Sequence, residues 1–548
     1  MSSKHIYLDQ VGFLPAGGKR AVLNFPAEDF TVTDAAGQVV YRGRVSHFGT
    51  DDISGVDTYV ADFDDFETPG AYRVQAGGAS SASFAISEQA YDGLFRDICK
   101  TFYYLRCGAG LSEEYAGLYV HGACHDTLAV PFADPAAPGR DVTGGWHDAG
   151  DYGRYSTAGA VAAAHILLAV RFFGNLKDLS FHIPAVPCDQ GVLPDILAEV
   201  KYELDFLLKM QREDGAVWHK VSTRYHAAFV MPEEDRGQLY LYDPSSMAAA
   251  DVAAVFALAY TVYKDYDAAY ADRLLTAARR SHDWLMAHPE PVLFKNPPDS
   301  GTGEYGEWED ISNRYWAACA LYEATGEEAF LKEAEGYTAI LEGPMSERRW
   351  VPGLTGMGWA PVSGLGSLSL LLSGEENDLT GRVRAALLKA AEESVKVASR
   401  NGFGLCMKPA DFFWGSNMEL GKHLMILTVA DLLQPSESYE RAIQKGLDYL
   451  LGCNALAISF VTGNGERAFR NPHLRPTAAD NVEDPWPGLV SGGPNAGRQD
   501  ATGKDLAPDL PPMCCYLDRV ESYSFNEITI YWNSPFVFVL AGIYEKRK

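Results

Sequence analysis

The chain has 548 residues, with 73 acidic against 46 lysine and arginine side chains, and so a formal net charge of −27. A hydrophobic content of 47% and a charged content of 22% describe an ordinary globular protein, whose length predicts two or more domains. The charge disfavours nucleic acid and anionic membrane surfaces as partners, because phosphate binding needs clustered lysine and arginine.

The N-terminal segment, residues 1–7, lacks the apolar core of a signal peptide. No run of about 18 apolar residues predicts a membrane span. The nine cysteines are odd in number and scattered, which favours a reducing compartment over a disulfide framework. We therefore expect a cytoplasmic protein without a membrane partner, or a secreted one whose leader was removed, and we expect a monomer.

Residues 1–87 read as a small β-sandwich domain. Short β-type runs at 21–23, 30–32 and 38–41 are separated by clusters of turn-forming residues. No catalytic pattern stands out in this part of the chain. We interpret it as a packing module beside the second domain, with carbohydrate binding as the alternative.

From residue 88 to residue 548 the apolar periodicity becomes helical. It predicts helices at 89–106, 159–174, 192–211, 247–266, 268–288, 312–325, 327–341, 363–373, 381–400, 418–433, 436–452 and 527–545. Twelve helices are the number that six hairpins closed into an all-α (α/α)6 barrel require. The predicted fold class is therefore an all-β sandwich followed by an all-α barrel.

Residues 144–152 form a glycine-flanked, aromatic-lined turn that contains Asp148 and Asp151. Two acids this close can divide their work, one binding a water molecule and the other taking its proton. The alternative is that both serve turn formation or a metal loop, the usual roles of aspartate beside glycine.

Two C-terminal blocks make the functional prediction specific. The first runs from residue 459 to the sequence Pro-His-x-Arg, and the second from residue 516 to 534. Together with the Asp-Ala-Gly-Asp turn, these blocks resemble glycoside hydrolase family 9, which contains many cellulases. The resemblance implies the (α/α)6 barrel, and residues 10–15 resemble the start of the immunoglobulin-like module that precedes many family 9 catalytic domains.

The resemblance implies an inverting hydrolase, in which a general acid and a general base lie roughly 6.5–9.5 Å apart. Glu527 matches the acid, Asp151 the base, and Asp148 the group that holds the same water. Glu527 should then have a raised pKa, from partial burial or a neighbouring carboxylate. Otherwise it is a carboxylate at the start of helix 527–545, where it favours the helix dipole.

The same motifs imply groups that bind the substrate near the cleaved bond. His473 and Arg475 are donors suited to sugar hydroxyls, and Asp518 and Tyr523 occupy matching positions in the last motif. Three tryptophans are candidate stacking platforms for sugar rings, although each could equally belong to the core: Trp146, Trp359 and Trp414.

Four further residues supply two thiolates and two imidazoles, the ligand set of a structural Zn2+ site: Cys107, Cys124, His125 and His147. They resemble the positions of a zinc in some family 9 enzymes that carry the immunoglobulin-like module, with His121 as a spare candidate. The alternative is buried free cysteine and ordinary histidine.

A calcium site that many relatives hold is not predicted, because Arg314 stands where a carboxylate ligand is expected. Three acids nearby could compensate: Glu307, Glu309 and Asp310.

The predicted function is hydrolysis of β-1,4-glucosidic bonds in cellulose-like glucans or cello-oligosaccharides, as an endoglucanase or cellodextrinase. One alternative is an exo-acting glycosidase of the same family, such as an exo-β-glucosaminidase. Another is a carbohydrate-binding protein without catalysis, against which the intact Asp148, Asp151 and Glu527 argue. The segment 481–512, rich in proline, glycine and aspartate, is a candidate wall for one end of the cleft.

Overall fold

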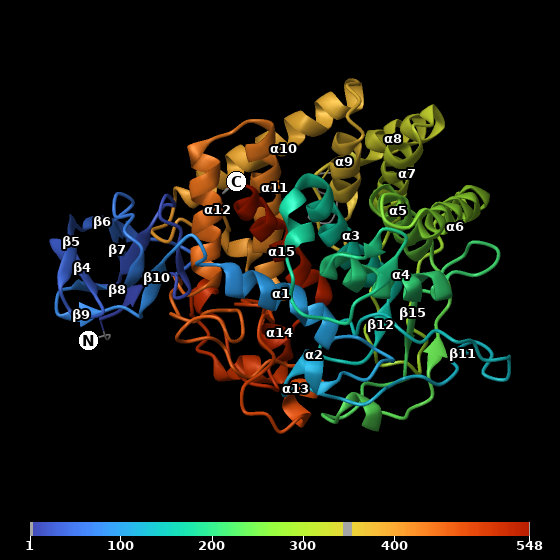
Figure 1. Ribbon diagram of the computed structural model, residues 1–548, viewed down its shortest axis with the longest axis horizontal. Coiled ribbons are helices and arrows are strands. Elements are labelled where there is room, and N and C mark those ends of the chain that lie inside the picture. Colours follow the sequence, from blue (N-terminus) through green and yellow to red (C-terminus); the bar gives the residue numbers. More distant parts are fainter. Residues whose placement is uncertain (1–3, 344–352, 547–548) are drawn as a thin grey trace. The chain divides into compact units, whose positions relative to one another are not determined.

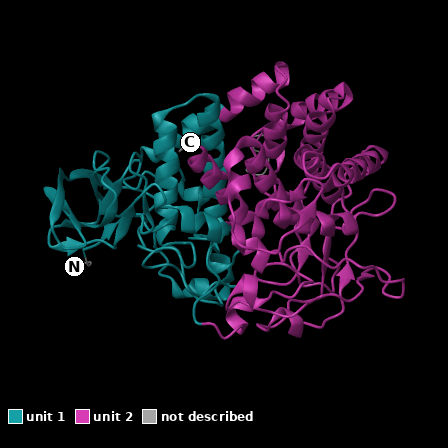
Figure 2. Ribbon diagram, in the orientation of Figure 1, with its two compact units in different colours: residues 1–98, 388–473, 483–528 teal, residues 99–387, 474–482, 529–548 magenta. Residues whose placement is uncertain are grey.

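The computed structural model describes residues 4–343 and 353–546. Strands dominate residues 6–86, and helices follow (Figure 1). The chain divides into two compact units: unit 1 contains residues 1–98, 388–473 and 483–528, and unit 2 contains residues 99–387, 474–482 and 529–548 (Figure 2). Three residues of the N-terminal segment that was analysed for a leader, Met1 to Ser3, lie outside the described residues.

The predicted β-sandwich is confirmed, within unit 1, as two facing sheets. The first has the order β1 (Ile6–Tyr7), β3 (Arg20–Leu23), β7 (Asp57–Asp62), β6 (Ser46–Thr50). The second has the order β2 (Gly12–Phe13), β10 (Phe84–Ile86), β8 (Gly70–Ala76), β4 (Asp29–Asp34), β5 (Val39–Arg44), with β9 (Ala79–Ser80) beside β8. Side chains alternate along each strand, so Tyr72, Val74 and Ala76 of β8 face inward and join one apolar core with Leu23 and Phe63.

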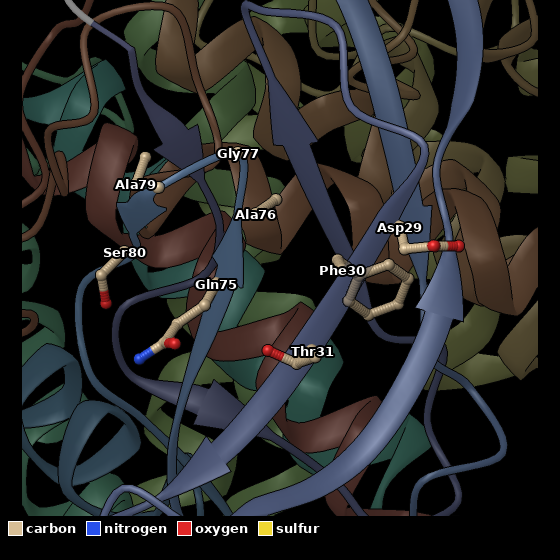
Figure 3. A pocket seen from close by; sticks show the side chains of 9 residues that line it. Asp29, Phe30, Thr31, Gln75, Ala76, Gly77, Ala79 and Ser80 are labelled. Carbon is tan, nitrogen blue, oxygen red and sulfur yellow. The ribbon is translucent and has the colours of Figure 1, made fainter.

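An open pocket of about 400 Å3 lies on this sandwich between β4 and the hairpin of β8 and β9 (Figure 3). Polar side chains line it, among them Asp29, Thr31 and Gln75. Its aromatic residue, Phe30, is 1% exposed and belongs to the core. The pocket thus offers no ring on which a sugar could stack, and the interpretation of this domain as a packing module stays a prediction.

Unit 2 holds most of the helices. They are α3 (Ser156–Phe172), α4 (Asp195–Met210), α5 (Ser246–Tyr263), α6 (Ala268–Ala287), α7 (Ile311–Thr325), α8 (Glu328–Leu341), α9 (Ser363–Leu372) and α15 (Ile530–Glu545), with the short α2 (Glu113–Ala116) and α13 (Arg475–Ala479). Helices α15, α3, α5, α7 and α9 contact one another in that order, and α4, α6 and α8 pack outside α3, α5 and α7. Inner α5 buries 17 of its 18 residues and outer α6 only 8 of 20, because an apolar circumference requires a buried helix and an apolar stripe a surface one.

Helix α5 corrects one expectation from the sequence. With 18 residues and a mean hydropathy of 1.5 it is long and apolar enough to cross a membrane, so the expectation that no such run exists is wrong. It is 94% buried inside the protein and carries the buried Asp251. The core helix of a globular fold has the same length and composition.

In unit 1, α11 (Ser416–Leu433) packs against α12 (Glu437–Leu450), while α1 (Asp92–Tyr104) and α10 (Asp378–Ala398) each continue from one unit into the other. The twelve predicted helices all form among the described residues, with every boundary within three residues of the one expected. The last helix begins at Ile530 rather than at residue 527, because the Thr529 side chain caps it by accepting the Trp532 N–H at 3.2 Å. Glu527 instead follows α14 (Tyr523–Asn526) in extended conformation.

A small sheet in unit 2 positions the turn that contains Asp148 and Asp151. Its strand order is β11 (Val130–Pro131), β16 (Tyr240–Leu241), β15 (Lys220–Ser222), β12 (Arg154–Tyr155), and a separate ribbon joins β13 (Pro187–Cys188) to β14 (Gly191–Val192). Strand β12 directly follows residues 144–153, so the turn is anchored at its C-terminal end.

Candidate active site

The turn with the two aspartates is buried and held at both ends. Asp148 is 1% exposed and Asp151 is 7% exposed. The Asp148 N–H donates to the Gly153 carbonyl at 3.0 Å, and the Ile530 N–H donates to the Asp148 carbonyl at 2.8 Å. Gly145 has φ +76°, and a Cβ there would lie 2.6 Å from the Phe206 ring, so this position requires glycine.

Asp151 is kept ionised by its neighbours in unit 2. Its Oδ2 lies 3.2 Å from His226 Nδ1 and accepts from the Gly153 N–H at 3.1 Å and the Tyr155 hydroxyl at 3.4 Å. Burial acts to raise the pKa of Asp151. The hydrogen bond and charge of His226, followed by the Arg475 guanidinium and the Gly153 N–H, outweigh it and hold the pKa below its usual value. Asp151 is thus ionised, which is the form in which a carboxylate can accept a proton.

Asp148 is bound by a tyrosine that the sequence analysis did not identify. The Tyr305 hydroxyl donates to Asp148 Oδ2 at 2.5 Å and lies 3.2 Å from the Tyr531 hydroxyl. Burial, and then the Asp148 charge, raise the pKa of Tyr305 well above its usual value, so this phenol remains a donor. Tyr305 has φ +50°, which a tyrosine adopts rarely and which marks a constrained site. The centre of the Trp359 ring lies 5.0 Å from the centre of the Tyr305 ring.

Arg475 supports the turn that contains Asp148 and Asp151. Its Nε donates to the Ala227 carbonyl at 2.8 Å and its Nη1 to the Gly150 carbonyl at 2.5 Å. The side chain therefore joins the loop of His226 to the turn of Asp151. Two of its donor groups are thus used within the protein, and its role as a donor to sugar hydroxyls stays a prediction.

In unit 1, Glu527 is held through its main chain. The Gly492 N–H donates to the Glu527 carbonyl at 2.8 Å, and the His473 N–H donates to the Asn526 carbonyl at 2.9 Å. His473 Nδ1 lies 2.6 Å from the Val520 carbonyl, and since a carbonyl only accepts, this nitrogen carries the proton. The interaction fixes the orientation of the imidazole.

Three rings gather beside this motif. The Tyr523 ring lies 5.3 Å from that of Trp414 and 5.8 Å from that of His473. Trp414 is 39% exposed and so retains surface for a ligand. The structure thus brings together three of the predicted substrate-binding residues in unit 1.

Two other predicted binding residues have different surroundings. Trp146 is 1% exposed and its indole N–H donates to Glu199 at 2.8 Å, so it belongs to the core, the alternative left open by the sequence. The carboxylate of Asp518 accepts the main-chain N–H groups of Arg470 and Asn471, each at 2.8 Å. Asp518 therefore organises the backbone of the motif.

The four candidate zinc ligands come together in unit 2. One donor atom each from Cys107, Cys124, His125 and His147 lies within 4.8 Å of the others, and all four residues are buried. The backbone of Cys107 is tied to the turn that contains Asp148 and Asp151, since the Cys107 N–H donates to the Gly145 carbonyl at 2.7 Å. The spare candidate, His121, is not in this group, and its Nδ1 lies 2.8 Å from the Gly122 carbonyl.

In the segment considered as a calcium site, an arginine side chain supplies the positive charge. The Arg314 guanidinium lies 2.9 Å from Asp310 Oδ2 and donates to the carbonyls of Leu285 at 3.1 Å and His288 at 2.7 Å. The Glu309 carboxylate accepts the Ile311 N–H. Oxygen atoms that could serve calcium are thus already used by an arginine and a main-chain amide.

Comparison with known proteins decides the family. The model described as "Glycosyl hydrolase family 9" matches residues 91–540, and "Cellulase N-terminal ig-like domain" matches residues 1–81. The chain belongs to glycosyl hydrolase family 9. It is therefore a glycoside hydrolase, with an immunoglobulin-like sandwich before its helical catalytic part.

Relatives of this family 9 enzyme match over nearly its whole length. A curated cellodextrinase from Butyrivibrio fibrisolvens is 56% identical, over 99% of this chain and 100% of that protein. A solved single-mutant thermostable endoglucanase from Alicyclobacillus acidocaldarius is 35% identical with a TM-score of 0.90, over 99% of this chain and 100% of that one. A zinc-binding triple mutant of a family 9 endoglucanase is 36% identical with a TM-score of 0.89, over 96% of this chain and 99% of that one. The helical part of this chain has the (α/α)6 barrel architecture of these structures.

Proposed function

We propose that this enzyme hydrolyses β-1,4-glucosidic bonds in cellodextrins and related cellulose-like glucans, with inversion at the anomeric carbon. The observation that carries the proposal is the buried pair Asp148 and Asp151, of which Asp151 has a lowered pKa. The substrate class follows from the full-length similarity to a protein named cellodextrinase.

In the proposed mechanism, Asp148 and Asp151 bind one water molecule and Asp151 takes its proton as the water attacks. The Tyr305 hydroxyl occupies Asp148 Oδ2 and so fixes how that carboxylate is turned. Glu527 donates a proton to the leaving glycosidic oxygen. Arg475 and His226 act through Asp151, by position and by charge.

We infer that Cys107, Cys124, His125 and His147 hold a structural Zn2+, which would fix the loops beside the catalytic turn. Two observations support the fit. His125 Nδ1 is buried without a hydrogen-bond partner, while its Nε2 lies 3.2 Å from Asp235. His147 Nδ1 lies 3.2 Å from the Tyr152 carbonyl, which leaves Nε2, 3.5 Å from Cys124 Sγ, as the ligand atom. Four protein ligands leave no position for a reacting water.

A product analysis tests the proposal. Purified enzyme is incubated with cellohexaose and, in parallel, with a glucosamine hexamer, and early products are followed by chromatography and by proton NMR. We expect shorter cellodextrins with an inverted anomeric configuration and no cleavage of the glucosamine hexamer. Asp151→Ala should abolish cleavage, and Asp134→Ala, on an exposed loop, should not.

Two results would overturn the proposal. Faster cleavage of the glucosamine hexamer would favour the exo-β-glucosaminidase alternative. A retained anomeric configuration would mean a nucleophilic carboxylate, with the two acids roughly 5 Å apart.

A further inference from the structure

The segment 492–503, within the stretch expected to wall one end of the cleft, lies along the residues that lead to Glu527. The Gly492 N–H donates to the Glu527 carbonyl at 2.8 Å, and the Gly493 N–H donates to the Phe525 carbonyl at 2.9 Å. The Asn495 side-chain amide donates to the Ser524 carbonyl at 2.9 Å. All of these residues belong to unit 1, and together they support the main chain from 524 to 527.

This segment is itself fixed at the start of α11. The Asn417 N–H donates to the Gly492 carbonyl at 3.0 Å, and the Asn417 side chain donates to the Ser491 carbonyl at 2.9 Å. A Cβ at Gly493 would lie 2.6 Å from Asn417 Cγ, so this close approach requires glycine. The segment that holds the Glu527 loop is thus itself hydrogen-bonded to the start of a mostly buried helix.

Asp500 connects the far end of this segment to α14. Its side chain accepts five hydrogen bonds, and the residue as a whole is 6% exposed. Oδ1 accepts from the Thr502 N–H and hydroxyl at 2.9 and 2.6 Å and from the Gly503 N–H at 3.2 Å. Oδ2 accepts from the Ser524 N–H and hydroxyl, both at 2.8 Å.

The hydrogen bonds to Ser524 matter because α14 is too short to be stable without outside contacts. It has four residues, and its own N-cap residue, Ser522, makes no capping hydrogen bond. A single helical turn has no stability alone, and an uncapped first turn leaves N–H groups without acceptors. Asp500 supplies the missing acceptor from a distant part of the chain.

Both ends of α14 carry residues of the proposed site. It begins with Tyr523, whose ring lies 5.3 Å from Trp414, and Glu527 follows its last residue. We propose that Asp500 is a positioning residue for catalysis, which orients Tyr523 and Glu527 by anchoring Ser524. The proposal rests on the assignment of Glu527 as the general acid under the proposed function.

The Asp500→Asn substitution tests this positioning role. Burial raises the pKa of Asp500, but hydrogen bonds from Thr502 and Ser524 hold it below its usual value, so the group accepts at both oxygens. Asparagine has one acceptor oxygen, and its NH2 group would face either the donors of Ser524 or those of Thr502 and Gly503. One anchor must therefore be lost without a change in side-chain size.

The experiment compares Asp500→Asn with wild type in the full-length enzyme, on cellotetraose and on dinitrophenyl β-cellobioside, whose leaving group needs little protonation. We expect kcat on cellotetraose to fall about 10- to 100-fold, since misplacement of a catalytic group by about 1 Å costs on that order. On the activated substrate the loss should be no more than about threefold. In a Glu527→Gln background, Asp500→Asn should add less than about twofold on cellotetraose, because residues that act as a unit are not additive.

Asp34→Asn is the matched control, since Asp34 accepts two main-chain N–H groups in a turn of the β-sandwich, and it should leave both activities unchanged. If Asp500→Asn does not fold, Ser524→Ala, which removes one donor to Oδ2, should show a smaller loss of the same substrate dependence. Equal losses on both substrates, or full additivity with Glu527→Gln, would overturn the proposal. If Glu527→Gln alone is harmless, the acid assignment itself fails. If Glu527→Gln is damaging and Asp500→Asn is not, only the role of Asp500 fails.

Discussion

Replacement of His226 by alanine should move the acid limb of the pH–rate profile. His226 Nδ1 lies 3.2 Å from Asp151 Oδ2, and its hydrogen bond and charge are the main opponents of the burial that would raise the pKa of Asp151. Without this partner, Asp151 should protonate at a higher pH and cease to act as a base. We therefore expect the acid limb of the pH profile of kcat/KM on cellotetraose to shift to higher pH. The alkaline limb, which the proposed general acid Glu527 sets, should not shift.

The structure limits the size of this effect. An opposite charge at this distance lowers a carboxyl pKa by about 1 to 3 units. The His226 side chain is 39% exposed, so solvent screens it and the lower end applies. Arg475 and the Gly153 N–H remain in the variant and continue to favour the ionised form. The acid limb should therefore move up by about one pH unit.

The same change has a stability consequence with a definite sign. A carboxyl group with a lowered pKa stabilises the fold above its unfolded pKa of about 3.9, and this contribution is lost as pH falls through the folded value. In His226→Ala this contribution should be smaller, because the folded and unfolded pKa values of Asp151 lie closer together, and its loss should be complete at a higher pH, which thermal unfolding between about pH 2 and 6 would show.

The control is His47→Ala, which removes a histidine 2.7 Å from Asp57 on the β-sandwich and should leave the profile unchanged. An unchanged acid limb in His226→Ala, with activity lost equally at every pH, would refute the reasoning. It would mean that His226 contacts the substrate instead of tuning Asp151.

Two further predictions concern the acid and the metal. Glu527→Gln should lower turnover of cellotetraose by about 100-fold or more, the scale of lost general-acid catalysis, and should harm the activated cellobioside much less. Equal losses on both substrates in steady-state kinetics would contradict that assignment. Cys124→Ser should lower both the melting temperature and the zinc content measured by elemental analysis, because the metal stabilises only the folded site. It should also lower activity, since His147 directly precedes Asp148, while Cys188→Ser serves as control on a cysteine outside the cluster.

Helix positions could be predicted from the sequence because each barrel helix carries its own signal. Outer α6 shows an apolar stripe with Leu274, Ala278 and Leu285, and inner α5 is apolar on all sides. That second pattern is also the one that resembles a membrane span, and only packing against α3, α6 and α7 shows which it is. The start of α15 was misplaced for a local reason, since the cap at Thr529 competes with a continuous apolar run.

The four candidate metal ligands could be identified because their chemistry is rare in itself. Two cysteines and two histidines suit a zinc site whatever the loops between them do, and the structure gathers them within 4.8 Å. Tyr305 and His226 offered no such signal. Tyr305 contacts Asp148 across 157 residues of sequence, and one tyrosine among 29 has no local pattern that marks it.

The polar residues of the motifs fall into two groups, those that hold loops in place and those placed to contact the sugar, and residue type alone does not distinguish them. Long loops are buried here, and every buried main-chain N–H and carbonyl needs a partner. Arg475, Asp518 and Asp500 meet that need, since each binds the main chain of a loop that carries a proposed catalytic group or its neighbour. Residues that hold such loops are as constrained as those that contact the sugar, because a small displacement of a loop or of the sugar misaligns the acid and the base with the bond to be cleaved. A motif therefore contains both loop-holding and sugar-contacting residues, and only the hydrogen-bond partners in the structure distinguish the two.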